Sequence, residues 1–428
     1  MTRRVPSLLA ALVVGPLLAA TACVPDAPAA PRWVSTRAAR VTSPGTTVNL
    51  IGAWTDADWA ASLELTSVTG GGGGVSLKFF PRSGADNSVL GSPQSVTPTV
   101  SPTLLGPIGE HIVALGGSTA VEFFRQTAGV WGSAGTFALP TDMQLAAMDD
   151  RWMVLRSIAL NPGTEGRVEV YSVDASGPTV TVTLATTLTS DPAWPLALRE
   201  GFGSPWISLD GNLMVVAAQG MFTPTPGGAR VFRAVGGVWG AVASLGAAPG
   251  GPNQFAAAAA VDDGATVDRL ALSPTPVSPA PPTVDVYADT GAGFVLEQSL
   301  SRDTADPDSF SGLLFGNTIA LDGDVLAVTA RGVKVPSAEV GHADVGVGYV
   351  QMFHRTTVGA TSTWQREAEV GAFVTPAPAD VVSMYPVRLQ AVGSHVAVSV
   401  LVNPDPPAGC QFPCFAFGFE AWSFDRTT

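Results

Sequence analysis

Apolar and polar residues alternate in short runs through most of this chain, and turn-forming residues separate the runs. The clearest example covers residues 313–372, where four alternating runs follow one another. An Asp-Gly turn joins the first two runs, a long polar segment joins the second to the third, and a short turn leads into the fourth. Alternation with a period of two and turns of this kind predict four antiparallel strands in one small sheet.

The same plan recurs along the chain. A turn residue stands between two apolar runs in successive units, at Glu110, Asp150, Gly211, Gly264, Gly323 and Ser394. No long segment has the apolar spacing and the caps of a helix. Repeated four-stranded sheets are typical of β-propellers, so we predict an all-β fold, a seven-bladed β-propeller over residues 32–428.

The two ends of the repeated region complement each other. The last unit ends after its third run, Phe419–Phe424, and a lone alternating run lies at Trp33–Val41. An N-terminal strand that completes the last blade would close the ring and cover an exposed sheet edge. We therefore predict that these two segments pair.

The first 22 residues have the composition of an export signal. Arg3 and Arg4 precede an apolar run from Leu8 to Ala22, which is too short to span a bilayer comfortably. The residues before Cys23 resemble a bacterial lipobox and also suit ordinary signal cleavage. We predict a signal peptide at 1–22, a lipidated Pro/Ala tether at 23–31 and an extracytoplasmic protein anchored to a bacterial membrane through Cys23, with secretion as the alternative.

Charge narrows the range of partners. The formal net charge is −13, and Lys78 and Lys334 are the only lysines. A chain this acidic is repelled by phosphate backbones, so we expect no nucleic-acid partner. We also expect a monomer that touches the membrane through its lipid anchor only.

The histidines and loop carboxylates offer few catalytic patterns. His342 lies in a long loop close to Glu339 and Asp344, and we retain His342 and Asp344 as ligand-binding candidates. Motifs such as His-Glu-x-x-His and Gly-x-Ser-x-Gly are absent from the sequence. The cluster of Asp303, Asp306 and Asp308 lacks the glycine turn of a calcium loop. We predict a solvated acidic loop that contacts ligand, with no metal site and no cofactor.

Two cysteines and several tryptophans have structural interpretations. Cys410 and Cys414 flank Gln-Phe-Pro, and a disulfide is the simplest pairing in an exported protein, with a redox pair as the alternative. Trp131, Trp239 and Trp364 recur at the start of the fourth strand, which predicts packing between blades. Trp194 and Trp206 fall outside that pattern and are candidate ligand contacts.

One unit resembles a known repeat. Residues Phe315–Val328, and more loosely Phe202-Gly203 with Leu209–Gly211, are similar to the FG-GAP repeat of integrin-α-type propellers and of exported bacterial proteins. The resemblance implies a propeller fold. The Asp/Asn-rich calcium loops of that family have no counterpart in this sequence, so the resemblance implies no metal.

Long and varied segments join the predicted strands on one face of such a ring. They are Gln219–Gly228, Ser273–Pro282, Asp303–Phe310 and Arg331–Gly346. Because variable loops on a rigid frame often carry recognition, we predict a binding or scaffold module for a protein or surface polysaccharide. The alternative is a polysaccharide hydrolase or lyase that uses carboxylates from different blades near the axis, and an architectural envelope protein without a ligand is a third interpretation.

Overall fold

The structure is a computed structural model, and the part of it that can be described consists mainly of short strands. The described residues are 32–41, 46–55, 59–68, 73–83, 89–100, 102–107, 112–158, 163–219, 227–246, 254–264, 267–275, 283–301, 315–335, 345–358, 361–370, 381–392, 395–404 and 418–427.

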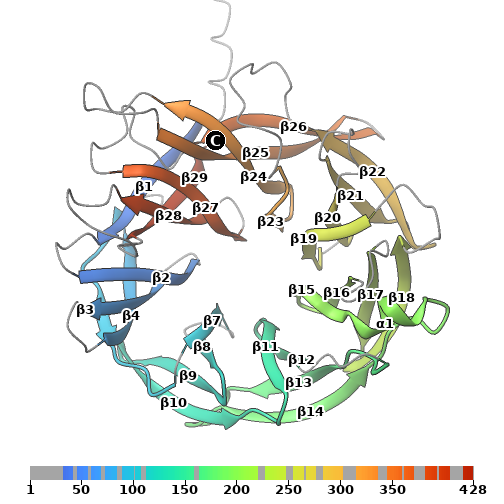
Figure 1. Ribbon diagram of the computed structural model, residues 1–428, viewed down its shortest axis with the longest axis horizontal. Helices are drawn as coiled ribbons and strands as arrows, with labels where there is room; N and C mark the ends of the chain where they lie inside the picture. Colours follow the sequence, from blue (N-terminus) through green and yellow to red (C-terminus); the bar gives the residue numbers. More distant parts are fainter. Residues whose placement is uncertain are drawn as a thin grey trace, which may run out of the picture.

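Small antiparallel sheets are arranged around a central axis (Figure 1), and each is formed by strands that follow one another along the chain. The first sheet contains β2 (Thr46–Thr55), β3 (Trp59–Val68), β4 (Gly73–Ser83), β5 (Val89–Leu90) and β6 (Gln94–Val96). The second contains β7 (Pro102–Pro107), β8 (Ile112–Gly117), β9 (Ala120–Thr127) and β10 (Val130–Ala138). The third contains β11 (Met143–Met148), β12 (Trp152–Ser157), β13 (Val168–Asp174) and β14 (Thr181–Leu188).

The fourth and fifth sheets follow the same order. The fourth contains β15 (Phe202–Asp210), β16 (Leu213–Ala218), β17 (Gly228–Val235) and β18 (Val238–Gly246). The fifth contains β19 (Gln254–Asp262), β20 (Arg269–Thr275), β21 (Thr283–Asp289) and β22 (Phe294–Ser301). The arrangement confirms the prediction of an all-β, propeller-like fold.

The remaining strands form one eight-stranded sheet, which we call the joined sheet. Its members are β23 (Ile319–Asp322), β24 (Val325–Val335), β25 (Val345–Val358), β26 (Thr361–Val370), β27 (Val381–Val392), β28 (His395–Pro404), β29 (Gly418–Thr427) and β1 (Arg32–Val41). A short parallel pairing of β25 with β27, at Gly346↔Ser383 and Val347↔Met384, merges what the sequence pattern predicts as two units. The N-terminal strand β1 pairs antiparallel with β29, from Arg32↔Thr427 to Val41↔Phe419, so the two predicted segments do pair.

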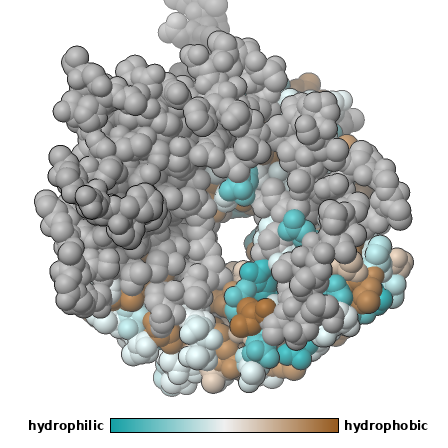
Figure 2. All heavy atoms as spheres, in the orientation of Figure 1, coloured by the Kyte–Doolittle hydropathy of each residue, from teal (hydrophilic) through white to brown (hydrophobic). Residues whose placement is uncertain are grey.

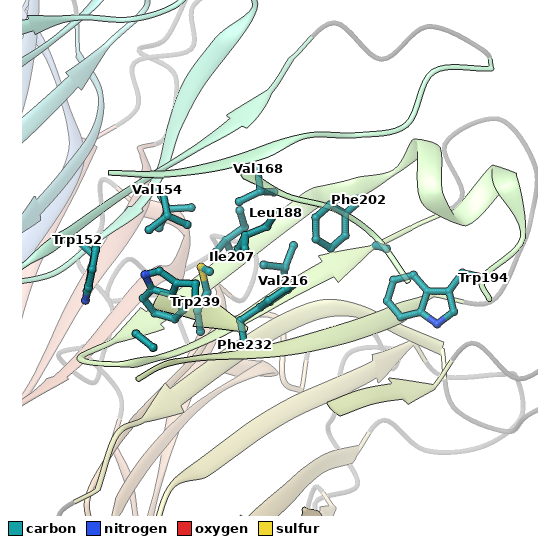
Figure 3. Close-up of a cluster of buried hydrophobic side chains, with 14 of the residues drawn as sticks. Trp152, Val154, Val168, Leu188, Trp194, Phe202, Ile207, Val216, Phe232 and Trp239 are labelled. Carbon is teal, nitrogen blue, oxygen red and sulfur yellow. The ribbon is translucent and has the colours of Figure 1, made fainter. Parts of the chain in front are cut away.

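Hydrophobic clusters fill the spaces between neighbouring sheets. In β12, Trp152 and Val154 belong to a cluster shared with the fourth sheet (Figure 3), while Met153 and Leu155 belong to a cluster shared with the second. Successive side chains of a strand point to opposite faces, so this strand is buried on both sides. That double burial explains why the apolar runs in the second strands are nearly continuous rather than strictly alternating.

The recurring tryptophans lie in these clusters, which confirms their predicted packing role. The Trp131 ring stacks on Phe79 of the first sheet, with centroids 3.9 Å apart and an interplanar angle of 2°. The Trp239 ring meets Trp152 of the third sheet edge to face at 5.4 Å. Trp364 packs in the cluster between the fifth and joined sheets, and its backbone N–H donates to Gln298 of the fifth sheet at 2.8 Å.

The strand directions define two faces of the molecule. In each four-stranded unit, the turn between the first and second strands and the turn between the third and fourth strands lie on one face, which we call the hairpin face. The connections between second and third strands, and those between sheets, lie on the opposite face, the crossover face. The described strands that flank the four long segments predicted to carry recognition lead into them at the crossover face, and most residues of those segments lie outside the described part of the chain.

One short helix interrupts the strands. Helix α1 (Leu196–Glu200) connects β14 to β15, and its Leu198 side chain is buried between the third and fourth sheets. Among the described residues, no helix is long and apolar enough to cross a membrane.

Candidate functional site: carboxylates around the axis

Most residues predicted from the sequence to contact ligand lie outside the described part of the chain. These residues are Asp303, Asp306, Asp308, His342 and Asp344, and the same holds for the predicted lipidation site Cys23 and the predicted disulfide between Cys410 and Cys414.

The two tryptophan candidates are described and lie apart from each other. The Trp194 side chain is only 7% exposed and packs in the cluster between the third and fourth sheets (Figure 3). Trp206 is half-buried against the cluster shared by the fourth and fifth sheets. The structure therefore does not bring them together into one site, and their role as ligand contacts stays a prediction.

A different group of polar residues shares one position in successive sheets. The first strand of each sheet lies nearest the axis (Figure 1), so the turn that follows it reaches the axis on the hairpin face. In the third, fourth, fifth and joined sheets these turns carry aspartates, which we call the axial carboxylates. They are Asp149, Asp150, Asp210, Asp262, Asp263, Asp322 and Asp324. Figure 2 shows hydrophilic residues along the described part of the rim of the central opening.

Backbone hydrogen bonds hold three of these turns in fixed positions. The Asp210 carboxylate accepts from the N–H of Asp263 at 2.8 Å, and the Asp263 carboxylate accepts from the N–H of Asn212 at 2.6 Å. The Asp262 carboxylate accepts from the N–H of Gly323 in the joined sheet. Each carboxylate thus satisfies a donor of the turn that belongs to a neighbouring sheet.

The Asp-Gly sequence of the fourth sheet is required by this close approach. Gly211 has φ of 54°, in the left-handed region that glycine adopts without steric cost. A Cβ atom at this position would also lie 2.4 Å from the Oδ2 atom of Asp263. The turn therefore needs glycine both for its backbone conformation and for its contact with the fifth sheet.

Burial raises the pKa of several axial carboxylates. Desolvation raises the pKa of Asp149 to about 7, against the opposing effect of its hydrogen bonds from the N–H groups of Arg151 and Trp152. Desolvation, reinforced by the negative charges of Asp322 and Asp210, raises the pKa of Asp262 to about 6. The pKa of Asp210 is raised for the same reasons. Like charges that cannot be fully solvated disfavour the ionised form.

Two buried oxygen atoms in this group have no hydrogen-bond partner among the described residues. They are the Oδ2 atoms of Asp149 and Asp262, and the Asp262 residue is only 4% exposed. Such atoms are costly to bury and favour a cation or a proton beside them. No group of three His, Cys, Asp or Glu residues within the described ranges is arranged to hold a metal ion. The described axial carboxylates therefore create a negative electrostatic field at the axis.

The sequence contained a signal for this group that the loop-based interpretation did not use. An aspartate recurs at or next to the first turn of successive units, at Asp150, Asp210, Asp263 and Asp322. Alternation shows that each turn exists, but the convergence of four turns depends on how the sheets are placed around the axis. The predicted ligand residues came mainly from the long connections between strands instead.

Comparisons with known proteins show similarity at the level of fold. No family model matches the chain, and no curated protein matches it. The β-propeller domain of the trilobed protease from Pyrococcus furiosus is 8% identical, with 88% of this chain and 93% of that chain covered and a TM-score of 0.43. The acylaminoacyl peptidase of Pyrococcus horikoshii is 8% identical, with 83% and 49% covered and a TM-score of 0.41.

A puromycin-hydrolyzing peptidase of Mycobacterium tuberculosis is 12% identical, with 83% of this chain and 51% of that chain covered and a TM-score of 0.41. The chain spans about half the length of the acylaminoacyl peptidase and about half the length of the puromycin-hydrolyzing peptidase. The similarity concerns the propeller arrangement and carries nothing about activity.

The resemblance to the FG-GAP repeat is wrong as an assignment of family. No family model supports it, and the solved structures named above are propellers of peptidases. Packing explains the motif residues: Phe315 fills the cluster between the fifth and joined sheets, and Gly316 has φ of 83° with Ser273 in the space of a Cβ. Gly203 of the second matching unit likewise has φ of 89°. Local packing and backbone geometry account for these residues.

The predicted function is corrected as well. The sequence predicts a binding or scaffold module for a protein or polysaccharide, with a polysaccharide hydrolase or lyase as the alternative. Neither has a counterpart among the peptidase propellers that the chain matches. The physical basis of that prediction was the set of long loops on the crossover face. In the described part of the chain, the group of converging carboxylates is instead on the hairpin face.

Proposed function

We propose that the chain is a peptide-handling propeller whose axial carboxylates receive positively charged peptide segments. The observation that carries the proposal is the convergence of aspartates from four successive turns at one end of the central opening. The low TM-scores of the peptidase propellers contribute nothing to it.

A basic peptide suits this arrangement better than a small ion. The carboxylates come from several turns, and many of their oxygen atoms already accept backbone hydrogen bonds, as at Asp210 and Asp263. What remains is a negative potential spread over the opening, strengthened by a net charge of −13. The ammonium and guanidinium groups along an extended chain are spaced so that several of them meet such a field at once.

We further propose that the sheets form a closed ring of seven blades. The joined sheet divides naturally into one unit of β23–β26 and a second unit of β27–β29 completed by β1. The pairing of β1 with β29 supports this division. Arg426 of β29 also donates to both carboxylate oxygens of Glu367 in β26, at 2.6 and 2.8 Å, and such a bidentate contact fixes one unit against the next.

The sequence supports an extracytoplasmic location with a lipid at Cys23, a signal peptide at 1–22 and a tether at 23–31 before the folded body at 32–428. Mass spectrometry of the membrane-bound chain tests this part of the proposal. We expect a diacylated cysteine at the new N-terminus and loss of membrane association in Cys23→Ser. An unmodified N-terminal cysteine would leave secretion as the location.

Peptide binding is tested by fluorescence anisotropy with two unstructured peptides of equal length, one rich in Lys and one rich in Glu. We expect only the Lys peptide to bind, with an affinity that falls as salt is added. Asp150→Asn with Asp322→Asn removes two axial charges, and we expect roughly a three- to tenfold weaker affinity at low salt. Both substitutions nearly preserve side-chain shape.

The matched control removes two charges from the periphery through Asp174→Asn with Glu369→Gln, both of which are exposed. We expect the control to change affinity less than the axial pair does. Equal binding of the two peptides, or an equal effect of both double variants, would show that the axial carboxylates form no specific site.

A further inference from the structure

Several exposed valines lie at the tips of outer hairpins. The exposed fractions are 65% for Val130, 73% for Val235, 72% for Val238 and 80% for Val358. Turns at such positions are normally polar, because their residues face water on all sides. Single exposed apolar residues are common on protein surfaces, but several exposed apolar residues in equivalent positions indicate an interaction surface.

These valines share one place in the architecture. Val130 pairs with Thr127, Val235 with Val238, and Val358 with Thr361, and each pair closes the turn between the third and fourth strands of its unit. All four valines therefore lie on the outer part of the hairpin face. The corresponding pair in the third sheet, Asp174 with Thr181, is polar.

The described chain begins on this same face. Arg32 pairs with Thr427 at the end of β29, and Asp425 of β29 pairs with His395 beside the turn that joins β27 to β28. Because that turn lies on the hairpin face, β1 starts there too. Cys23 precedes Arg32 by nine residues, and nine residues reach at most about 30 Å when fully extended.

We infer that the hairpin face lies against a lipid bilayer and that the four valines at these three hairpin tips contact the bilayer surface. The inference rests on the proposed lipid anchor at Cys23. A short tether at this face keeps the valines close to the lipid, and apolar side chains gain free energy when they leave water for the boundary between headgroups and acyl chains. The valine contact adds to the lipid anchor by fixing which face of the protein is turned toward the bilayer.

The negative charges of the hairpin face determine which lipid headgroups this face can contact. The axial carboxylates and the net charge of −13 oppose contact with anionic lipids. We therefore expect shallow contact, strongest with zwitterionic headgroups. A peptide then reaches the axial carboxylates through the central opening from the crossover face, which points away from the bilayer.

Photo-crosslinking of the full lipidated chain in phosphatidylcholine vesicles tests this orientation. A benzophenone amino acid is placed at position 238, at position 358, or at position 158 as the control. Ile158 is 51% exposed and apolar, but it follows β12 on the crossover face. We expect lipid adducts at 238 and 358 to exceed those at 158 roughly fivefold, and to decrease when phosphatidylglycerol is mixed into the vesicles.

Flotation of each variant with the vesicles is measured in the same samples, so that the two proposals fail in different ways. A chain that floats but forms as many adducts at 158 as at 238 overturns the orientation while the anchor stands. A chain that does not float overturns the anchor, and the orientation falls with it. Thermal unfolding confirms that each variant is folded, as expected for substitutions at exposed positions.

Discussion

The Asp210 carboxylate accepts a hydrogen bond from the backbone N–H of Asp263 at 2.8 Å, across the boundary between the fourth and fifth sheets. The Asp263 carboxylate accepts in return from the N–H of Asn212. Two like-charged side chains are thus held near each other because each one satisfies a donor on the other's turn. The arrangement fixes the position of the axial carboxylates and links neighbouring sheets at their innermost point.

Removal of this link is expected to cost stability. Asp263→Ala leaves the N–H of Asn212 without its acceptor, and we expect a loss of about 1–2 kcal/mol in the free energy of unfolding. Asp263→Asn keeps an acceptor oxygen at the same place and is expected to lose less. Urea denaturation of the two variants measures the difference, and equal losses would mean that the hydrogen bond is not the cause.

Stability should also depend on pH through Asp149 and Asp262, whose pKa values of about 7 and about 6 exceed the ordinary value of 3.8. Between these values and 3.8 the folded state binds more protons than the unfolded state. These two groups therefore add stability as the pH falls from 8 to about 5, and that gain is lost as the pH rises through the folded pKa values.

The melting temperature of Asp149→Asn compared with that of the wild type isolates this effect. We expect the difference between the two to change by the equivalent of about 1–3 kcal/mol between pH 5 and pH 8, with the variant relatively more stable at pH 8. The asparagine retains an oxygen for the N–H groups of Arg151 and Trp152. A difference that is constant with pH would show that Asp149 keeps an ordinary pKa.

The sequence predicted the strands well because each depends on a local pattern. The alternation in Leu321–Val328, the Asp-Gly turn within it and the recurring tryptophans all follow from residues close together in the chain. Pairing of the N-terminal strand with β29 was predictable from one spare run and one incomplete unit. The parallel contact between β25 and β27 was not, since nothing in the pattern of either strand encodes it.

The candidate site was predictable only in part. The sequence allows carboxylates from different units to meet near the axis but identifies no pair, because alternation does not show how far each turn reaches inward. Burial of Asp262 and the reciprocal bonds of Asp210 and Asp263 depend on the placement of three sheets. The match to the repeat motif was misleading for a related reason, because the pair Phe315-Gly316 satisfies local packing and backbone needs of this fold.

Substitutions at two glycines with positive φ distinguish the cost of backbone strain from the cost of steric crowding. Gly316 has φ of 83° and its Cβ would lie 2.4 Å from the Oγ atom of Ser273, whereas Gly129 has φ of 81° and open space around it. We expect Gly129→Ala to cost about 1 kcal/mol and Gly316→Ala clearly more, since the second change adds a steric clash. Chemical denaturation gives both values, and similar costs would mean that Ser273 moves aside freely.

Loss of a recurring tryptophan should reveal how firmly neighbouring sheets are packed. Trp131→Ala removes the ring that stacks on Phe79 and leaves a cavity between the first and second sheets, so we expect a loss of about 3–5 kcal/mol. Trp131→Phe keeps part of the stacking and is expected to lose less. If Trp131→Ala unfolds at the same denaturant concentration as the wild type, the interface between these sheets contributes little to stability.

The partnership of β1 with β29 has a consequence for biosynthesis. During synthesis, β1 emerges long before its partner β29, so the pair cannot form until the strands between them have been made. Contacts between distant parts of a chain form slowly, and unpaired strands are prone to misassembly in the meantime. The pairing of β1 with β29 is therefore expected to be a late step in folding, after the sheets between these two strands have formed.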